Sequence, residues 1–167
     1  KLKAQAEKDG IEFFMAMGTE VNGKPNASVA PAQYLDDLLD NGAAFAGFAS
    51  GGLWQEPSDG DIAYMPDPNT YTRMPWRHEM GLMMAFPHVN GEPWPYAPQN
   101  ILKRLMDEVN DEFGWTFKTG MEPEFFLVRK NADGSIRIAD ELDTAVKPCY
   151  HPYGIERSWP YLAKLSR

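Results

Sequence analysis

The hydrophobic pattern of the first 95 residues predicts short strands around one amphipathic helix. Residues 11–17 are apolar and aromatic, which is typical of a buried strand. The pair Asn22-Gly23 follows, and it supplies the positive φ values that a tight hairpin needs. In chain order the pattern predicts a polar helix over 1–9, strands over 11–17 and 27–30, a helix over 32–40, and strands over 61–65, 71–74 and 80–86.

A proline-rich stretch divides the chain, because residues 92–98 contain three prolines. It is followed by apolar residues at helical spacing over 99–113, and Gly114 ends that predicted helix. Further strands are predicted over 115–118, 121–130 and 135–139. We therefore expect one domain over residues 1–95 and a second over residues 96–167.

Composition narrows the classes of protein. The 167 residues carry 16 Lys and Arg against 24 Asp and Glu, a net charge of −8, which disfavours nucleic acid and anionic membranes as partners. No apolar run reaches the roughly 18 residues of a membrane span. Cys149 is the single cysteine, so no internal disulfide can form, and we expect a reducing compartment, the cytoplasm.

The most informative motif is Gly-Met-Glu-Pro-Glu-Phe-Phe-Leu-Val at residues 120–128. In a strand, Glu122 and Glu124 would point to the same face, because side chains alternate with a period of two. Paired carboxylates suit hard divalent cations such as Mg²⁺ or Mn²⁺. The alternative is an exposed strand edge with two solvated glutamates, and the spacing alone leaves both open.

Two other segments have a weaker chemical signal. The glycine-rich run at 47–54 contains neither Gly-x-Gly-x-x-Gly nor a P-loop lysine, so a binding loop and a flexible loop both remain open. The run at 131–136 superficially suggests a calcium loop. Its first ligand position would be Arg129, so we interpret it as a hairpin turn.

The residues at 120–127 resemble the first catalytic-domain strand of glutamine synthetases. Supporting matches lie along nearly the whole chain: Lys24-Pro25, Val29-Ala30-Pro31-Ala32, Tyr64-Met65-Pro66-Asp67-Pro68, Pro75-Trp76-Arg77 and Ala97-Pro98-Gln99-Asn100-Ile101-Leu102-Lys103-Arg104. The resemblance implies an α+β fold, with an N-terminal β-grasp domain and the beginning of a glutamine-synthetase-type catalytic domain. The chain starts at Lys1 and ends in a helix-like pattern, so we expect a truncated piece of a longer protein.

Within that family the chain most resembles the γ-glutamylmethylamide synthetases and related glutamate–alkylamine ligases. The matching runs are residues 42–47, 143–150 and 153–155. The resemblance implies ATP-dependent ligation of an amine to L-glutamate through γ-glutamyl phosphate, with Mg²⁺ or Mn²⁺. It implies that Glu122 binds the metal nearer the ATP phosphates and Glu124 the metal nearer the glutamate.

One departure from the family concerns the amine. Ammonia-using members commonly have Phe-Asp-Gly-Ser-Ser where this chain has Phe48-Ala49-Ser50-Gly51-Gly52. That aspartate acts on ammonium in the neighbouring subunit, and Ala49 lacks its charge and leaves room for an alkyl group. The resemblance therefore implies an amine-site loop of Ala49, Ser50, Gly51, Gly52 and Trp54. We expect methylamine as substrate, with ethylamine, isopropylamine or a polyamine as alternatives.

The resemblance also implies partners. We expect a homo-oligomer, a dodecamer of two stacked hexamers, acting in nitrogen metabolism. We assign no catalytic residue within these residues and expect them to be inactive alone, since the family's other ligands lie further along. Two alternatives remain: an ordinary glutamine synthetase that uses ammonia, and a non-catalytic β-grasp interaction module, against which the paired glutamates argue.

Overall fold

The computed structural model describes residues 1–49, 55–144, 146 and 150–166. These residues form two compact units, Lys1–Phe117 and Lys118–Arg167. The domain boundary expected between residues 95 and 96 stays a prediction. Each unit is described by itself below.

Unit 1, residues 1–117, combines one sheet with short helices. Its elements are α1 (Leu2–Asp9), β1 (Phe13–Thr19), β2 (Pro25–Pro31), η1 (Ala32–Tyr34), α2 (Leu35–Asn41), β3 (Ala43–Phe45), η2 (Gly47–Ala49), β4 (Ile62–Pro66), η3 (Pro68–Thr70), β5 (Thr72–Arg73), β6 (Met80–Val89), β7 (Glu92–Pro93) and α3 (Pro98–Phe113), where η marks a 3-10 helix.

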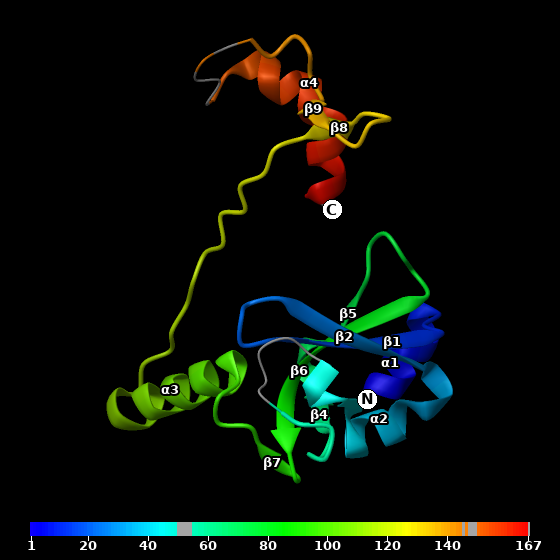
Figure 1. Ribbon diagram of the computed structural model, residues 1–167, viewed down its shortest axis with the longest axis vertical. Coiled ribbons are helices and arrows are strands. Elements are labelled where there is room, and N and C mark those ends of the chain that lie inside the picture. Colours follow the sequence, from blue (N-terminus) through cyan, green and yellow to red (C-terminus); the bar gives the residue numbers. More distant parts are fainter. Residues whose placement is uncertain (50–54, 145, 147–149, 167) are drawn as a thin grey trace. The chain divides into compact units, whose positions relative to one another are not determined.

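Within the described part of unit 1, seven strands form one mixed sheet with the order β2-β1-β6-β4-β3, and β5 and β7 pair with β6 (Figure 1). The central pair, β1 with β6, is parallel, and the other pairs are antiparallel. Two antiparallel strand pairs thus flank a parallel centre, with α2 in the connection. This is the β-grasp arrangement, and the α+β prediction is confirmed.

The core lies on one face of this sheet because inward and outward side chains alternate along its central strands. Phe14 of β1, Ile62 and Tyr64 of β4, and Met83 of β6 are fully buried. Burying a side chain of this size contributes about 1.5–3 kcal/mol. Leu35 of α2 packs into the same cluster, so the helix closes the core.

Local signals set the turns and helix ends. Gly23 has a φ of 84° in the β1–β2 turn, and Asn90 and Gly91 have φ values of 53° and 82° between β6 and β7. Gly10 ends α1 with a φ of 69°. Gly23 confirms the hairpin turn predicted from Asn22-Gly23, and the other two sites follow the same preference of Asn-Gly turns and helix ends for positive φ.

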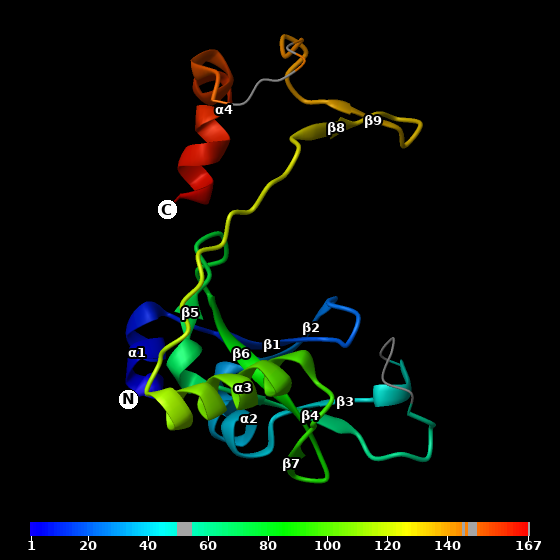
Figure 2. The same cartoon turned by 90° about the vertical axis from the view of Figure 1, so that its left-hand side faces the viewer.

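Polar contacts at the first turn of helix α3 attach it to β6 and to Trp94 in the connection that precedes the helix. The Asn100 Nδ2 donates to the carbonyl oxygens of Pro87 and Trp94, at 2.7 and 2.8 Å. Gln99 Nε2 donates to the Ala85 oxygen at 3.3 Å. The helix thus begins beside β6 (Figure 2), one residue before the predicted start at residue 99.

Unit 2 is smaller. The strands β8 (Val128–Lys130) and β9 (Ile136–Ile138) form an antiparallel pair, followed by α4 (Pro152–Leu165). Residues 114–127 have no regular secondary structure. The prediction of a strand over 115–118 is therefore wrong, and of the strand predicted over 121–130 only the last three residues, β8, are found. A strand needs a hydrogen-bonding neighbour along its length, and β9 pairs with residues 128–130 of this stretch.

Across the ranges that the structure describes, no helix is long and apolar enough to cross a membrane.

Candidate functional site

The predicted metal ligands Glu122 and Glu124 lie in the irregular segment at the start of unit 2. Both are exposed. Among the described residues, neither carboxylate has an ion-pair or hydrogen-bond partner. The strand that would place both on one face is not formed there, so the expected shared face is not found. What the structure provides is two exposed carboxylates, two positions apart in the sequence.

Two carboxylates are an incomplete set for a protein-bound metal. Within the described ranges, no three His, Cys, Asp or Glu side chains come together in an arrangement that could hold an ion. The oxygen donors do fit Mg²⁺ or Mn²⁺, which prefer carboxylates and keep several waters. The metal role of Glu122 and Glu124 therefore stays a prediction that is chemically consistent with the donors present.

Unit 2 contains a hollow of about 580 Å³, whose lining begins at Phe125, the residue that follows Glu124 in the sequence. Phe125 and Phe126 line it together with the β8–β9 hairpin and α4. An ion pair joins α4 to the segment that follows β9: Arg157 Nε lies 2.5 Å from Asp140 Oδ2. The Arg157 guanidinium lowers the pKa of Asp140, so this carboxylate stays charged.

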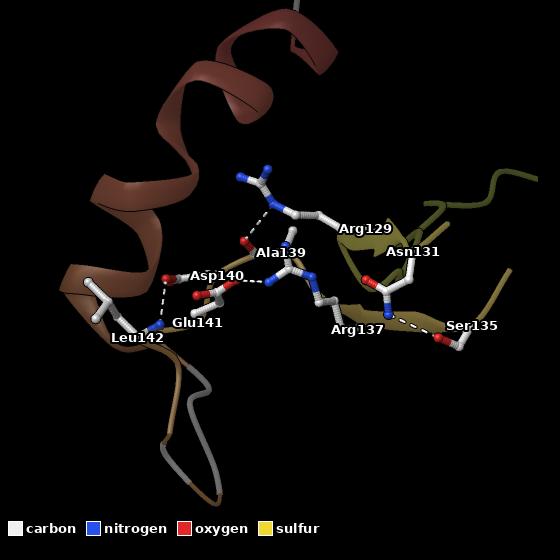
Figure 3. Close-up of polar contacts among 8 residues, drawn as sticks. All are labelled: Arg129, Asn131, Ser135, Arg137, Ala139, Asp140, Glu141 and Leu142. Carbon is white, nitrogen blue, oxygen red and sulfur yellow. Dashed lines mark hydrogen bonds and ion pairs between the residues drawn. The ribbon is translucent and has the colours of Figure 1, made fainter. Parts of the chain in front are cut away.

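Further polar contacts hold the hairpin itself (Figure 3). Arg129 Nε donates to the Ala139 oxygen at 3.3 Å, and Arg137 pairs with Glu141. Asn131 Nδ2 donates to Ser135 Oγ at 2.9 Å across the turn. These contacts are internal to the hairpin.

The side chain of Asp133 stabilises the turn between β8 and β9. Asp133 Oδ1 accepts hydrogen bonds from the backbone N and the Oγ of Ser135, at 2.9 and 2.6 Å. These bonds lower the pKa of Asp133. Gly134 has the positive φ of a turn, 86°. The interpretation as a hairpin turn is confirmed.

Only the first residue of the predicted amine-site loop, Ala49, lies within the described residues. Ala49 ends η2, is exposed, and donates its N–H to the Ala46 oxygen at 3.0 Å. Ser50, Gly51, Gly52 and Trp54 lie outside the described residues. The role of this loop therefore stays a prediction.

Gly47 allows a close contact between described residues on the two sides of that loop. It is buried, and a Cβ at this position would collide with the Gln55 side chain and lie 3.1 Å from Ile62 Cδ1. Gln55 in turn donates to the Gly60 oxygen at 3.2 Å. Glycine at 47 therefore lets the two ends of the loop pack together over the core.

Two features of unit 1 were not predicted from the sequence. A groove of about 530 Å³ lies between the sheet and α3, and the helix turns charged residues such as Lys103 and Asp107 toward it. The second feature is Glu20, which is buried immediately after β1. The alternation Phe14, Ala16, Gly18, Glu20 is the signal that could have identified it, since it places the acid on the inward face.

Comparison with known proteins gives relatives of one kind. The chain is 37% identical to a glutamine synthetase of Rhizobium leguminosarum bv. phaseoli over 166 residues, which is 98% of this chain and 37% of the relative. It is 33% identical to a glutamate–methylamine ligase of Methyloversatilis universalis over 161 residues, 96% of this chain and 36% of the relative. No family model matches the chain.

Solved structures agree with these relatives. A structure of GmaS, γ-glutamylmethylamide synthetase, in complex with ADP has a TM-score of 0.83 at 31% identity, over 99% of this chain and 37% of that chain. GmaS without ligand has a TM-score of 0.82 at 31% identity. This chain thus spans a little over a third of the length of the proteins it matches.

Proposed function

Since the chain belongs to the glutamine synthetase family, we propose that it is part of a ligase that uses ATP to join an amine to the γ-carboxylate of L-glutamate. One observation carries this proposal: both glutamine synthetases and a glutamate–methylamine ligase match nearly the whole chain. Cytoplasmic location is part of the same proposal, and the single cysteine is compatible with a reducing compartment.

The proposed reaction has two steps. A γ-carboxylate oxygen of glutamate attacks the terminal phosphorus of ATP, and ADP leaves. The amine nitrogen then attacks the γ-carbonyl carbon of the acyl phosphate, inorganic phosphate leaves, and the nitrogen loses a proton. Both steps gather negative charge at the phosphoryl group, which positive charge must offset.

Glu122 and Glu124 are the residues proposed to hold divalent cations in this ligase. Bound Mg²⁺ or Mn²⁺ would supply that positive charge. Both carboxylates are exposed, and among the described residues neither is used in an ion pair or hydrogen bond. They are therefore available as ligands, together with donors from outside this chain segment.

The metal role is tested with Glu122→Gln and Glu124→Gln in the full-length enzyme, against Glu112→Gln as an exposed control on α3. Losing a ligand should raise the half-saturating Mg²⁺ concentration at least about tenfold, because losing an outer-shell partner alone costs 10–100-fold. The control should leave it unchanged. Equal Mg²⁺ dependence in all three variants contradicts the assignment.

We propose further that the enzyme prefers an alkylamine, methylamine first, over ammonium. Ala49 supports this, because it is small, uncharged and exposed at the end of η2, where ammonia-using family members commonly carry an aspartate. A methyl group buried near it would gain about 1 kcal/mol. Ordinary glutamine synthetase activity is the second candidate, favoured by the 37% identity to the Rhizobium enzyme.

The test compares kcat/KM for methylamine, ethylamine, isopropylamine and ammonium by phosphate release with ATP and glutamate. Methylamine should exceed ammonium, and Ala49→Asp should move the preference toward ammonium. Ala49→Asn is the matched control, since it has the same shape without the charge. A clear preference for ammonium in the unmodified enzyme contradicts the alkylamine proposal.

Assembly is the last part of the proposal. The family resemblance supports a homo-oligomer, a dodecamer of two stacked hexamers, in which the β-grasp domain completes the neighbour's amine site. Light scattering of the full-length enzyme measures the mass directly. Mixed Glu124→Gln and Ala49→Asp subunits should have more methylamine activity than either variant alone if the two positions act in sites shared between subunits.

A further inference from the structure

Glu20 brings a carboxylate into the interior of unit 1. It follows β1 on the same inward face as Phe14, Ala16 and Gly18, and only 3% of its surface is exposed. Its backbone N–H donates to the Lys24 oxygen at 2.8 Å. Within the described residues, however, its Oε2 atom has no hydrogen-bond partner.

A second buried oxygen without a partner lies close by. Gln99 donates its Nε2 to the Ala85 oxygen, but in the described part of the chain its Oε1 atom accepts no bond. Gln99 packs over Gly18, where a Cβ would lie 2.9 Å from Gln99 Nε2 and 2.7 Å from Tyr64 Cε2. Gly18 is two residues before Glu20 on the same face, so Gln99 and Glu20 lie on the same side of the chain that leaves β1.

The electrostatic effect of Glu20 on Tyr64 is a separate indication that the two side chains are close. Burial raises the pKa of Tyr64, and the negative charge of Glu20 raises it further. The Tyr64 side chain shares a hydrogen bond with Asn26 and packs against Phe45, with ring centroids 4.5 Å apart. The polar region is therefore walled by Tyr64, Gly18 and the buried Ala85.

Within the described part of the chain, Glu20 has no positive counter-charge. Among the described residues it forms no ion pair with lysine, arginine or histidine, and the nearby Lys24 is exposed. A buried carboxylate without a counter-charge is strongly unfavourable. Both free atoms are acceptors, so they can be satisfied together by a cation but not by each other.

We propose that Glu20 and Gln99 bind a monovalent cation, potassium or sodium, inside the β-grasp unit. One positive charge matches the one carboxylate, and the oxygens of Glu20 and Gln99 are hard donors. Glu20 is only 3% exposed, which leaves little surface for a lysine of another chain to reach. A divalent ion such as Mg²⁺ is disfavoured, because it would need several retained waters in a space bordered by apolar groups.

The site is tested by thermal unfolding of the full chain in potassium, sodium or choline chloride at equal ionic strength. Potassium or sodium should raise Tm by about 2–4 °C in a saturable way, since ligand binding to the native state alone stabilises it. Glu20→Gln should abolish the difference between potassium and choline. Glu12→Gln, an exposed acid just before β1, should retain it.

Gln99→Lys is the complementary variant, because it would place an ammonium group beside Glu20. It should unfold at the same temperature in potassium and in choline, at or above the potassium value of the unmodified chain. Thallium(I) NMR tests binding directly, and a bound signal should be displaced by potassium.

Three results would overturn the proposal. One is a Tm in choline equal to that in potassium for the unmodified chain, as expected if only a water molecule fills the space. Another is a potassium response that survives Glu20→Gln. The third is the lack of a bound thallium signal, which is informative even if Glu20→Gln fails to fold.

Discussion

Units 1 and 2 differ in what their apolar side chains contact. In unit 1, Phe14 and Ile62 are completely buried between the sheet and its helices. In the described part of unit 2 no residue is buried, and Phe126 is 91% exposed. The same kind of apolar pattern therefore produced a core in one unit and open surface in the other.

The difference follows from the partners available to each strand. β1 and β6 pair with each other and with neighbours on both sides, so their inward faces stack on helices. β8 has only β9. A two-stranded hairpin is marginal by itself, and at least three strands or a covering helix are needed to bury one face.

Helix α3 is intermediate between the two cases. Its sequence is amphipathic, yet Leu102 and Leu105 remain about half exposed and no residue of the helix is buried. Its side toward the sheet groove carries Lys103 and Asp107 instead, 2.6 Å apart. An amphipathic pattern thus predicts the helix, but not which of its faces the neighbouring sheet meets.

Removing a phenylalanine side chain should destabilise unit 1 far more than unit 2. Phe14→Ala should lower the free energy of unfolding by about 3–5 kcal/mol, because it removes a fully buried ring and leaves a cavity. Phe126→Ala should change it by no more than about 0.5 kcal/mol. Urea unfolding followed by far-UV circular dichroism measures both. Equal losses would mean that Phe126 is buried in solution.

Two glycines provide a smaller contrast. At Gly81 an added Cβ would lie 2.7 Å from the Tyr71 ring and 3.0 Å from the Phe14 ring, so Gly81→Ala should cost about 1–3 kcal/mol by overpacking. At Gly120 nothing lies within 4 Å, so Gly120→Ala should be tolerated. Calorimetric Tm values test the pair, and the contrast fails if Gly120→Ala lowers Tm as much.

The smallest effect is a shift in one titration. Arg157 lowers the pKa of Asp140 in unit 2, so the fold favours the charged carboxylate. The resulting stabilisation is complete above the ordinary pKa of 3.8 and is lost as the pH falls through the lower folded value. Arg157→Gln should raise the pKa of Asp140 toward 3.8, as measured by carboxyl NMR.

Asp9 in unit 1 is the internal control for that titration. Its pKa is also lowered, first by a hydrogen bond from Gln5 and then by one from the Tyr71 hydroxyl, 2.9 Å away. Arg157→Gln should leave it unchanged. A shift in both carboxyls would show that the variant perturbs the whole chain and not the Asp140 contact.

Much of unit 1 could be predicted from sequence because its signals are local. Asn22-Gly23 predicts the β1–β2 turn, and the apolar spacing predicts α3 to within one residue. β3 was missed, since Ala43–Phe45 is too short and too small in side chains to stand out. It becomes a strand only because β4 pairs with it.

The candidate metal site was less predictable, because its geometry also depends on a neighbouring strand. The resemblance singled out Glu122 and Glu124, but the shared strand face required a neighbouring strand that residues 121–127 do not have. Glu20 was overlooked although its alternation with Phe14 and Gly18 places it inward. Its importance depends on the missing counter-charge, and only the packed structure reveals that.

A competition experiment distinguishes the two amine substrates in one reaction. The full-length enzyme is given ATP, Mg²⁺, L-glutamate and equal concentrations of methylamine and ammonium, and the products are identified by mass spectrometry. We expect ATP-dependent formation of both amides from glutamate, with γ-glutamylmethylamide in excess over glutamine. Glutamine in clear excess would contradict the proposed amine preference, and the formation of neither product would contradict the ligase function itself.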